Sequence, residues 1–314
     1  MANHTLLLLS QDNAEYHALL KQAYLPGLTI LAPREETDIQ AALTRADILL
    51  GEPARIKARL RDARALKWAQ STYAGVDLLL GPGSRQDYLL TNIRGIFGPL
   101  ISEYVFGHLL SISRHLRHYR EQQRHHNWQP IPYQSIHGKT MLILGTGSIG
   151  QHVAATARHF GMEVLGISRA GREAPGFDRT YQVQALNKVL PRADVVLSVL
   201  PSTPETRALF NAERLSHIKP GAIFFNVGRG DAVDETALVQ ALRNGRIGAA
   251  VLDVFAIEPL PTDSPLWDLP NVVISPHNAG YSFPDQIVTR FSRNYLKYIE
   301  SKPMEGLVDF DLGY

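Results

Sequence analysis

Two series of short apolar segments alternate with helical patterns along this 314-residue chain, and this alternation limits the fold more than any other feature. Buried strands that alternate with helices form parallel sheets with helices on both faces. The first series predicts one such unit in the first hundred residues. Its strands are expected at residues 6–9, 28–31, 48–50 and 66–70, and its helices around residues 16–23, 38–46 and 56–63.

The second series follows a long helical stretch at residues 100–124, which is rich in His and Arg. Strands are expected at residues 140–144, 163–167, 195–199, 222–226, 248–252 and 272–274, and a last helix at residues 284–300. Asp234 is the expected N-cap of a helix at residues 235–243, which Asn244 and Gly245 end. The fold class is therefore α/β, with two doubly wound parallel-sheet domains.

Composition excludes several classes of protein. The formal net charge is only +2, with 32 basic and 30 acidic side chains, which disfavours nucleic-acid or membrane partners. No cysteine is present, which excludes disulfides, thiolate catalysis and cysteine-ligated zinc and suits a reducing cytoplasm. No apolar segment approaches the roughly 20 residues that cross a bilayer. We expect a soluble cytoplasmic protein.

A glycine-rich turn follows the expected strand at residues 140–144 and begins a helix. In this arrangement the first glycine allows the tight turn, the second lets the backbone approach a pyrophosphate, and the third permits close helix–strand packing. Such turns also connect purely structural strand–helix units, but the context favours a dinucleotide site. The turn reads Gly145-Thr146-Gly147-Ser148-Ile149-Gly150.

The end of the next expected strand predicts which dinucleotide binds. NAD sites usually place Asp or Glu there to hold the ribose hydroxyls. This chain has Ser168 and Arg169 instead, followed by Arg172. A guanidinium and a hydroxyl suit an adenosine 2′-phosphate, so NADP(H) is preferred over NAD(H). The alternative is a solvated basic turn.

Three further residues suit the reduction of a ketone beside a carboxylate. Arg229 follows the expected strand at residues 222–226, Glu258 lies in a loop, and His277 follows Pro276. A guanidinium grips a carboxylate and polarises a carbonyl, an imidazolium delivers a proton, and a carboxylate holds the imidazolium. Each residue alone has an ordinary structural explanation, but their order behind the glycine turn predicts one site.

Taken together, these segments resemble the D-isomer-specific 2-hydroxyacid dehydrogenase family over essentially the whole chain. Within it the chain is most similar to the glyoxylate/hydroxypyruvate reductase A group. The resemblance implies a flavodoxin-like substrate domain at residues 1–98 and 285–314 and a Rossmann cofactor domain at residues 99–284. It also implies a homodimer formed through the region 100–124.

The resemblance further implies the roles of single residues. Arg229 would bind the substrate, His277 would donate the proton, and Glu258 would hydrogen-bond His277. Ala74, Gly75 and Val76 would bind the substrate carboxylate, and Asp253 would meet the nicotinamide carboxamide. Other cofactor contacts would come from the glycine turn, Ser168 and Arg169, and from Leu200, Pro201, Thr206, Val227, Gly228 and Gly280.

The expected function is NADPH-dependent reduction of small 2-oxoacids, with glyoxylate and hydroxypyruvate as first candidates. One alternative is an NADH-dependent reductase of bulkier 2-ketoacids. Another is a nucleotide-sensing regulator of the same fold, which the lack of a further segment after residue 314 disfavours. No metal is expected. A histidine cluster on the helical stretch has three alternative interpretations: a basic face that contacts a second subunit, a group of cations that attracts an anionic substrate, or a metal site. That cluster contains His108, His115, His118, His125 and His126.

Overall fold

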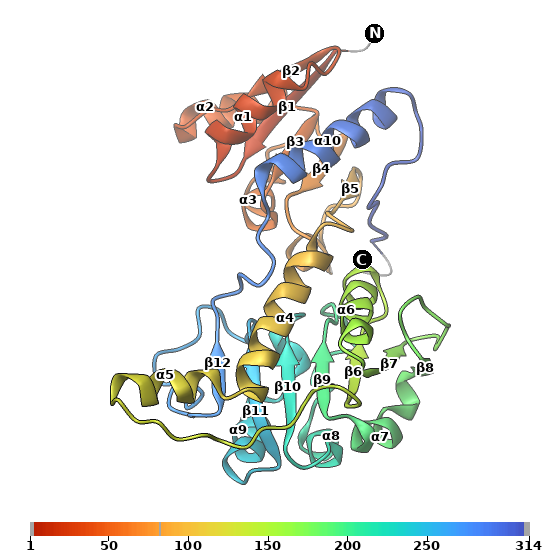
Figure 1. Cartoon of the computed structure of the whole chain (residues 1–314). Coiled ribbons are helices and arrows are strands. Elements are labelled where there is room, and N and C mark those ends of the chain that lie inside the picture. Colours follow the sequence, from red (N-terminus) through yellow and green to blue (C-terminus); the bar gives the residue numbers. More distant parts are fainter. Residues whose placement is uncertain (1–2, 82, 311–314) are drawn as a thin grey trace. The chain divides into compact units, whose positions relative to one another are not determined.

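The computed structural model describes residues 3–81 and 83–310, which form two compact units (Figure 1). Unit 1 contains the described residues up to Ile96 and those from Ser282 onward. Unit 2 runs from Phe97 to Tyr281. The assignment of substrate and cofactor roles to these units stays a prediction.

Unit 1 is built on a parallel sheet with the strand order β2-β1-β3-β4-β5, which is the flavodoxin-like order. Its helices α2 (Glu36–Leu43) and α3 (Pro53–Arg59) pack on one face, where Leu7 and Leu9 belong to the core. Helices α1 (Asn13–Gln22) and α10 (Pro284–Ile299) contact each other, and Phe291 of α10 stacks on Trp68 of β4. The strands are β1 (His4–Leu9), β2 (Leu28–Leu31), β3 (Ile48–Gly51), β4 (Trp68–Ser71) and β5 (Leu89–Thr91).

Unit 2 contains a longer parallel sheet with the order β12-β11-β10-β9-β6-β7-β8. Strands β7 and β8 lie on one side of β6 and strands β9 to β12 lie on the other, which makes the end of β6 a topological switch point. The fold class expected from the sequence, two doubly wound parallel-sheet domains, is therefore confirmed. The strands are β6 (Thr140–Leu144), β7 (Glu163–Ser168), β8 (Arg179–Gln182), β9 (Val195–Ser198), β10 (Ala222–Asn226), β11 (Ile247–Leu252) and β12 (Val272–Ile274).

The helices of unit 2 connect its strands, and one of them begins in the glycine turn. Helix α4 (Phe97–Ser113) packs on α6 (Ser148–His159), which begins with Ser148, Ile149 and Gly150 of the turn. Helix α9 (Glu235–Arg243) has the expected N-cap, because the Asp234 side chain accepts a hydrogen bond from the Ala237 amide. The remaining helices are α5 (Leu116–Arg124), α7 (Leu186–Val189) and α8 (Ala212–His217), with 3₁₀ turns at Asp77–Leu79, Val183–Ala185, Leu190–Arg192 and Gly230–Ala232.

The expectation of one helix at residues 100–124 is wrong. The chain breaks between α4 and α5 at His115, whose φ of 55° lies in the left-handed region and interrupts the helical hydrogen bonds. Strands β5 and β8 were not expected from the sequence, since one is only three residues long and the other is a polar edge strand. Across residues 3–81 and 83–310, no helix has the length and apolar character to cross a membrane.

Candidate active site

The residues predicted for catalysis and cofactor binding lie in loops at the carboxyl edge of the unit 2 sheet. Because all its strands are parallel, the loops that follow them meet at this edge, where open α/β sheets bind ligands. The strand order of the sheet therefore fixes the order of the loops. From β12 to β7 they carry His277, Asp253 with Glu258, Arg229, the segment 200–206, the glycine turn, and Ser168 with Arg169.

Glu258 and His277 form a hydrogen-bonded pair at this edge. The Nδ1 atom of His277 lies 2.8 Å from Oε2 of Glu258. The other carboxylate oxygen of Glu258 accepts a hydrogen bond from the Phe255 amide at 2.9 Å, which fixes the direction of the carboxylate. Both side chains of the pair are exposed. The pairing leaves Nε2 as the ring nitrogen that can transfer a proton to a substrate.

The side chain of Asn226 holds the turn that carries Arg229 through two hydrogen bonds to its backbone. Its side-chain amide donates to the Arg229 carbonyl at 2.9 Å, and its side-chain oxygen accepts from the Gly228 amide at 3.3 Å. Asn226 is only 1% exposed, so both of its polar ends are used to shape the turn. Arg229 itself donates to the Gly228 carbonyl at 2.8 Å and is half-buried.

Close backbone contacts on both sides fix the same turn. A Cβ atom on Gly228 would lie 2.6 Å from backbone atoms of Leu200 in the loop after β9. A Cβ atom on Gly230 would lie 1.8 Å from the carbonyl carbon of Phe255, in the loop that leads to Glu258. Neither position can hold a larger residue without a backbone shift. The turn of Arg229 is therefore packed directly against the loop of Glu258.

The glycine turn has the geometry that a pyrophosphate needs. Gly145 has a φ of 109°, and a Cβ atom there would lie 2.9 Å from the Val199 carbonyl oxygen. A Cβ atom on Gly150 would lie 2.0 Å from the Gly145 carbonyl oxygen, so helix α6 starts very close to the strand. A Cβ atom on Gly147 would meet nothing within 4 Å. This position leaves space in front of the helix terminus, and the turn fits a dinucleotide.

The other residues of the turn lie at the start of α6. Ser148 and Ile149 occupy its first turn, and Gly147 is the N-cap. The first amides of a helix have no partner within it and carry partial positive charge, which favours a phosphate. The Thr146 carbonyl accepts a hydrogen bond from the Gln151 side chain at 2.9 Å, which orients the peptide before the helix.

Ser168 and Arg169 lie at the end of β7, next to β6. The Ser168 hydroxyl oxygen accepts from the Gly171 amide at 3.1 Å, so its proton can still be donated to a ligand. Arg169 is exposed. The pKa of Glu205 is lowered chiefly by a hydrogen bond from the Thr203 side chain and, to a smaller extent, by the Arg169 guanidinium. A carboxylate from the loop after β9 therefore lies near Arg169.

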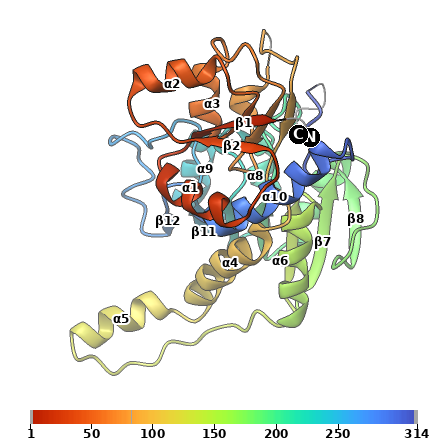
Figure 2. The ribbon, with the colours of Figure 1, turned by 90° about the horizontal axis from the view of Figure 1, so that it is seen from above.

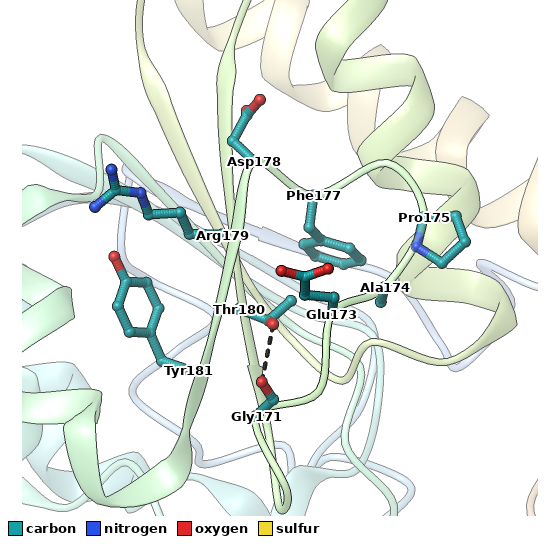
Figure 3. Close-up of a pocket in the computed structure, with 9 residues that line it drawn as sticks. All are labelled: Gly171, Glu173, Ala174, Pro175, Phe177, Asp178, Arg179, Thr180 and Tyr181. Carbon is teal, nitrogen blue, oxygen red and sulfur yellow. Dashed lines mark hydrogen bonds between the residues drawn. The ribbon is translucent and has the colours of Figure 1, made fainter.

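A polar pocket of about 660 Å³ begins two residues beyond Arg169 (Figure 3). The Thr180 hydroxyl donates to the Gly171 carbonyl at 3.0 Å across it. None of the residues predicted for catalysis or cofactor binding lines this pocket. It is formed by Gly171, Glu173, Ala174, Pro175, Phe177, Asp178, Arg179, Thr180 and Tyr181.

The loop after β9 is shaped by Thr206. Its hydroxyl donates to the Pro201 carbonyl at 2.6 Å and accepts from the Thr203 amide at 2.9 Å. The side chain of Thr206 thus stabilises the loop, and its predicted contact with the cofactor is not tested by this geometry. The cofactor contacts predicted for Leu200, Pro201, Val227, Gly228 and Gly280 also stay predictions.

The turn predicted to bind the substrate carboxylate lies in unit 1, after β4. The Asn92 side-chain amide donates to the Ala74 carbonyl at 2.7 Å and so fixes the start of the turn. Within the described part of the chain, the amides of Gly75 and Val76 donate no hydrogen bond. Two adjacent N–H groups of this kind suit a carboxylate. Their role in substrate binding stays a prediction.

Several residues that shape the site escaped the sequence analysis. Asn226 ends the strand expected at residues 222–226, and its position three residues before a glycine-flanked Arg is a usable signal. Tyr104 and Ser275, whose hydroxyl oxygens lie 2.6 Å apart, are 171 residues apart in the chain. No local sequence pattern predicts such a contact.

Comparisons with known proteins show the family of this chain. Residues 106–279 match the family model described as "D-isomer specific 2-hydroxyacid dehydrogenase, NAD binding domain". The chain is 33% identical over 214 residues to a glyoxylate/hydroxypyruvate reductase A of Serratia proteamaculans, which covers 68% of each protein.

Solved structures extend the likeness to the whole chain. A D-isomer specific 2-hydroxyacid dehydrogenase family protein from Aeromonas salmonicida is 60% identical, with a TM-score of 0.94 over 99% of this chain and 100% of that one. An NADPH-dependent glyoxylate/hydroxypyruvate reductase from Sinorhizobium meliloti, solved with NADP and sulfate, is 28% identical. Its TM-score is 0.89 over 99% of this chain and 100% of that chain.

Proposed function

The chain belongs to the D-isomer specific 2-hydroxyacid dehydrogenase family, and from this premise we propose that it reduces glyoxylate and hydroxypyruvate with NADPH. The observation that carries the proposal is the Glu258–His277 pair, which lies at the same sheet edge as the Arg229 turn and the glycine turn. Relatives that bear the names of such reductases support this choice of substrates.

The proposed reaction follows from the charges of the residues at the edge. When bound, NADPH would supply a hydride to the carbonyl carbon, and the carbonyl oxygen would take up the electron pair of the C=O π bond. Arg229 stabilises the negative charge that develops there, and His277 donates a proton to the same oxygen, which yields the hydroxyl group. Glu258 holds the ring of His277 and stabilises its charged form. The glycine turn would hold the pyrophosphate in place.

The direct test is NADPH oxidation by the purified protein with a panel of 2-oxoacids that includes glyoxylate, hydroxypyruvate and bulkier 2-ketoacids. We expect turnover with the two small acids and a loss of at least about 100-fold in kcat for His277→Asn. His217→Asn, on helix α8, is the matched control and should keep full activity. Turnover only with bulkier acids would overturn the substrate assignment, and full activity of His277→Asn would overturn the proton donor.

The preference for NADPH rests on Ser168 and Arg169 at the end of β7. A guanidinium pairs with the 2′-phosphate of NADPH, which NADH lacks. The solved relative with bound NADP supports this choice.

Substitution of Arg169 measures how much its guanidinium contributes to the preference for NADPH. Arg169→Ala should raise the KM for NADPH about tenfold or more and leave the KM for NADH nearly unchanged. Arg243→Ala removes an exposed guanidinium from the end of α9 and should change neither value. An equal loss with both cofactors would contradict the role of Arg169 in 2′-phosphate binding.

We also propose that the protein is a homodimer in which the arm, residues 114–137, contacts a second copy. Figure 2 shows α5 and the segment after it extending away from the rest of unit 2. The arm is internally ordered, because Tyr119 exchanges hydrogen bonds with the backbone of Ile131. Trp128 is nevertheless 98% exposed, and it borders a pocket of about 540 Å³. An aromatic side chain exposed to this extent is typical of an interface.

Sedimentation of the wild-type protein tests this assembly. We expect a dimer, and Trp128→Ala should weaken its association by about 30-fold or more. Tyr24→Ala, which removes a 90% exposed ring from unit 1, is the control and should leave the dimer intact. A wild-type monomer across the accessible concentrations would contradict the proposal. We also propose the cytoplasmic location that the sequence predicts.

A further inference from the structure

The Asp253 carboxylate is buried at the end of β11, and both of its oxygens bind the loop that carries His277. Oδ1 accepts the Ser275 hydroxyl at 2.6 Å and the Asn278 amide at 3.0 Å, and Oδ2 accepts the Ala279 amide at 3.1 Å. Asp253 is 2% exposed, so these bonds provide the partners that a buried charge requires. The carboxylate therefore holds the loop on both sides of His277.

His277 needs such support because of its own backbone. Its φ of 53° lies in the left-handed region, which costs free energy for any residue with a Cβ atom. A conformation of this kind persists only where the surrounding contacts determine it. The His277 amide donates to the Asp253 carbonyl at 2.9 Å and to the Ser275 carbonyl at 3.1 Å. The same neighbours thus hold the backbone from which the ring reaches Glu258.

The hydrogen bonds continue from Ser275 to Tyr104 in a fixed direction. The Ser275 hydroxyl has one proton, and it donates that proton to the Asp253 carboxylate. The phenol of Tyr104, 2.6 Å from the Ser275 oxygen, must then be the donor in that contact. Burial raises the pKa of Tyr104 to about 12, which keeps the phenol protonated and able to donate.

Tyr104 anchors this chain of bonds to a rigid element. It lies in the middle of α4, which packs on α6. Its ring also packs edge-on against His108, one turn further along the same helix, with ring centres 4.6 Å apart. The loop of His277 is therefore tied to the helix layer of unit 2 as well as to the sheet.

We propose that Tyr104 and Ser275 are positioning residues, which act through the Asp253 carboxylate to hold His277 where it pairs with Glu258. We call these three residues, Tyr104, Ser275 and Asp253, the clasp. The proposal rests on the function proposed above, since it makes the clasp matter for proton donation. It also assigns the carboxylate of Asp253 to the loop, whereas the sequence analysis assigned it to the nicotinamide.

The test uses Ser275→Ala and Tyr104→Phe, each of which removes a single hydroxyl. The kcat for the 2-oxoacid should fall about tenfold or more because the proton donor is misplaced, while the Kd for NADPH stays within about twofold. Amide hydrogen exchange of Asn278 and Ala279 should accelerate about tenfold or more. Ser275→Thr keeps a hydroxyl and should restore both values. Ser216→Ala, on helix α8, should behave as the wild-type protein.

The outcomes separate the clasp from the proposed function. Unchanged exchange at Asn278 and Ala279 in both variants would overturn the clasp, whatever the activity. Weaker NADPH binding with an unchanged kcat would also overturn it and return Asp253 to the cofactor. If the wild-type protein reduces no 2-oxoacid, the proposed function fails, while faster exchange in Ser275→Ala and Tyr104→Phe still supports the clasp as a structural device. Thermal melting of each variant identifies any loss of the whole fold.

Discussion

At the scale of single residues, Tyr88 and Tyr295 differ in whether their buried hydroxyl has a hydrogen-bond partner. Both are almost fully buried in unit 1. The hydroxyl of Tyr295 donates to the Pro26 carbonyl at 2.7 Å. Within the described residues, the hydroxyl of Tyr88 is buried without a hydrogen-bond partner, while its ring packs edge-on against Phe310. A buried polar group without a partner costs free energy of folding.

We therefore expect opposite effects on stability when each hydroxyl is removed. Tyr88→Phe should raise the free energy of unfolding by about 1 kcal/mol, and Tyr295→Phe should lower it by about 1 kcal/mol. Urea denaturation of both variants and the wild-type protein measures the difference. A Tyr88→Phe variant that loses as much stability as Tyr295→Phe would show that the Tyr88 hydroxyl is bonded in solution.

The same scale shows which residues of the site could be predicted. Arg229, Glu258 and His277 have side chains suited to the proposed reaction and stand in short segments of recognisable spacing, so the sequence pointed to them. The residues that hold them in place do not carry such a signal. Ser275 is a common residue at a strand end, and Tyr104 of α4 contacts it across a separation of 171 residues in the chain. Contacts of that kind exist only in the folded chain.

At the scale of elements, two glycines of the same turn have different roles: one is needed for the stability of the fold, and the other leaves space for a ligand. Gly150 is required by the protein itself, because any Cβ atom would meet the Gly145 carbonyl oxygen at 2.0 Å. Gly147 is not required by the protein, because a Cβ atom there meets nothing within 4 Å. The space next to Gly147 is where a phosphate would approach the start of α6.

This contrast predicts different defects for two similar substitutions. Gly147→Ala should change the melting temperature little but weaken NADPH binding about tenfold or more, since the methyl group occupies the phosphate position. Gly150→Ala should lower the melting temperature clearly, because the helix has to move away from the strand. Calorimetry and fluorescence titration with NADPH measure the two effects. Unimpaired NADPH binding by Gly147→Ala would place the pyrophosphate elsewhere.

Element boundaries could be predicted where apolar patterns were strong. Strands β2, β6, β10 and β12 have the expected bounds, because each is a compact apolar run between polar segments. The break at His115 could not be predicted, since neither Gly nor Pro occurs at residues 113–116. Strand β8 was missed because its residues, Arg179–Gln182, lack the apolar pattern of a buried strand.

At the scale of the whole molecule, both units contain tyrosines whose pKa is raised by burial: Tyr88, Tyr295 and Tyr298 in unit 1, and Tyr104 in unit 2. Burial raises the pKa of Tyr88 in unit 1 to about 12 and that of Tyr104 in unit 2 to about 12. An unfolded tyrosine titrates near pH 10. The unfolded chain therefore releases protons at a pH where the folded chain still holds them, so stability falls as the pH rises from about 10 to about 12.

Urea denaturation at about pH 9 and about pH 11 measures this loss. The urea midpoint of the wild-type protein should fall between the two values, and Tyr88→Phe should reduce the fall for the transition of unit 1. Equal sensitivity to pH in the wild-type protein and Tyr88→Phe would show that Tyr88 does not cause the loss.

We propose that residues at the unit 2 sheet edge direct the transfer of a hydride from NADPH and of a proton to a 2-oxoacid, in the stereochemical sense of the family. The most direct test is to incubate the protein with NADPH and hydroxypyruvate and to measure the amount and chirality of the glycerate formed. The account predicts one D-glycerate for each NADPH oxidised, and almost none with His277→Asn. Formation of L-glycerate, or no glycerate at all, would contradict it.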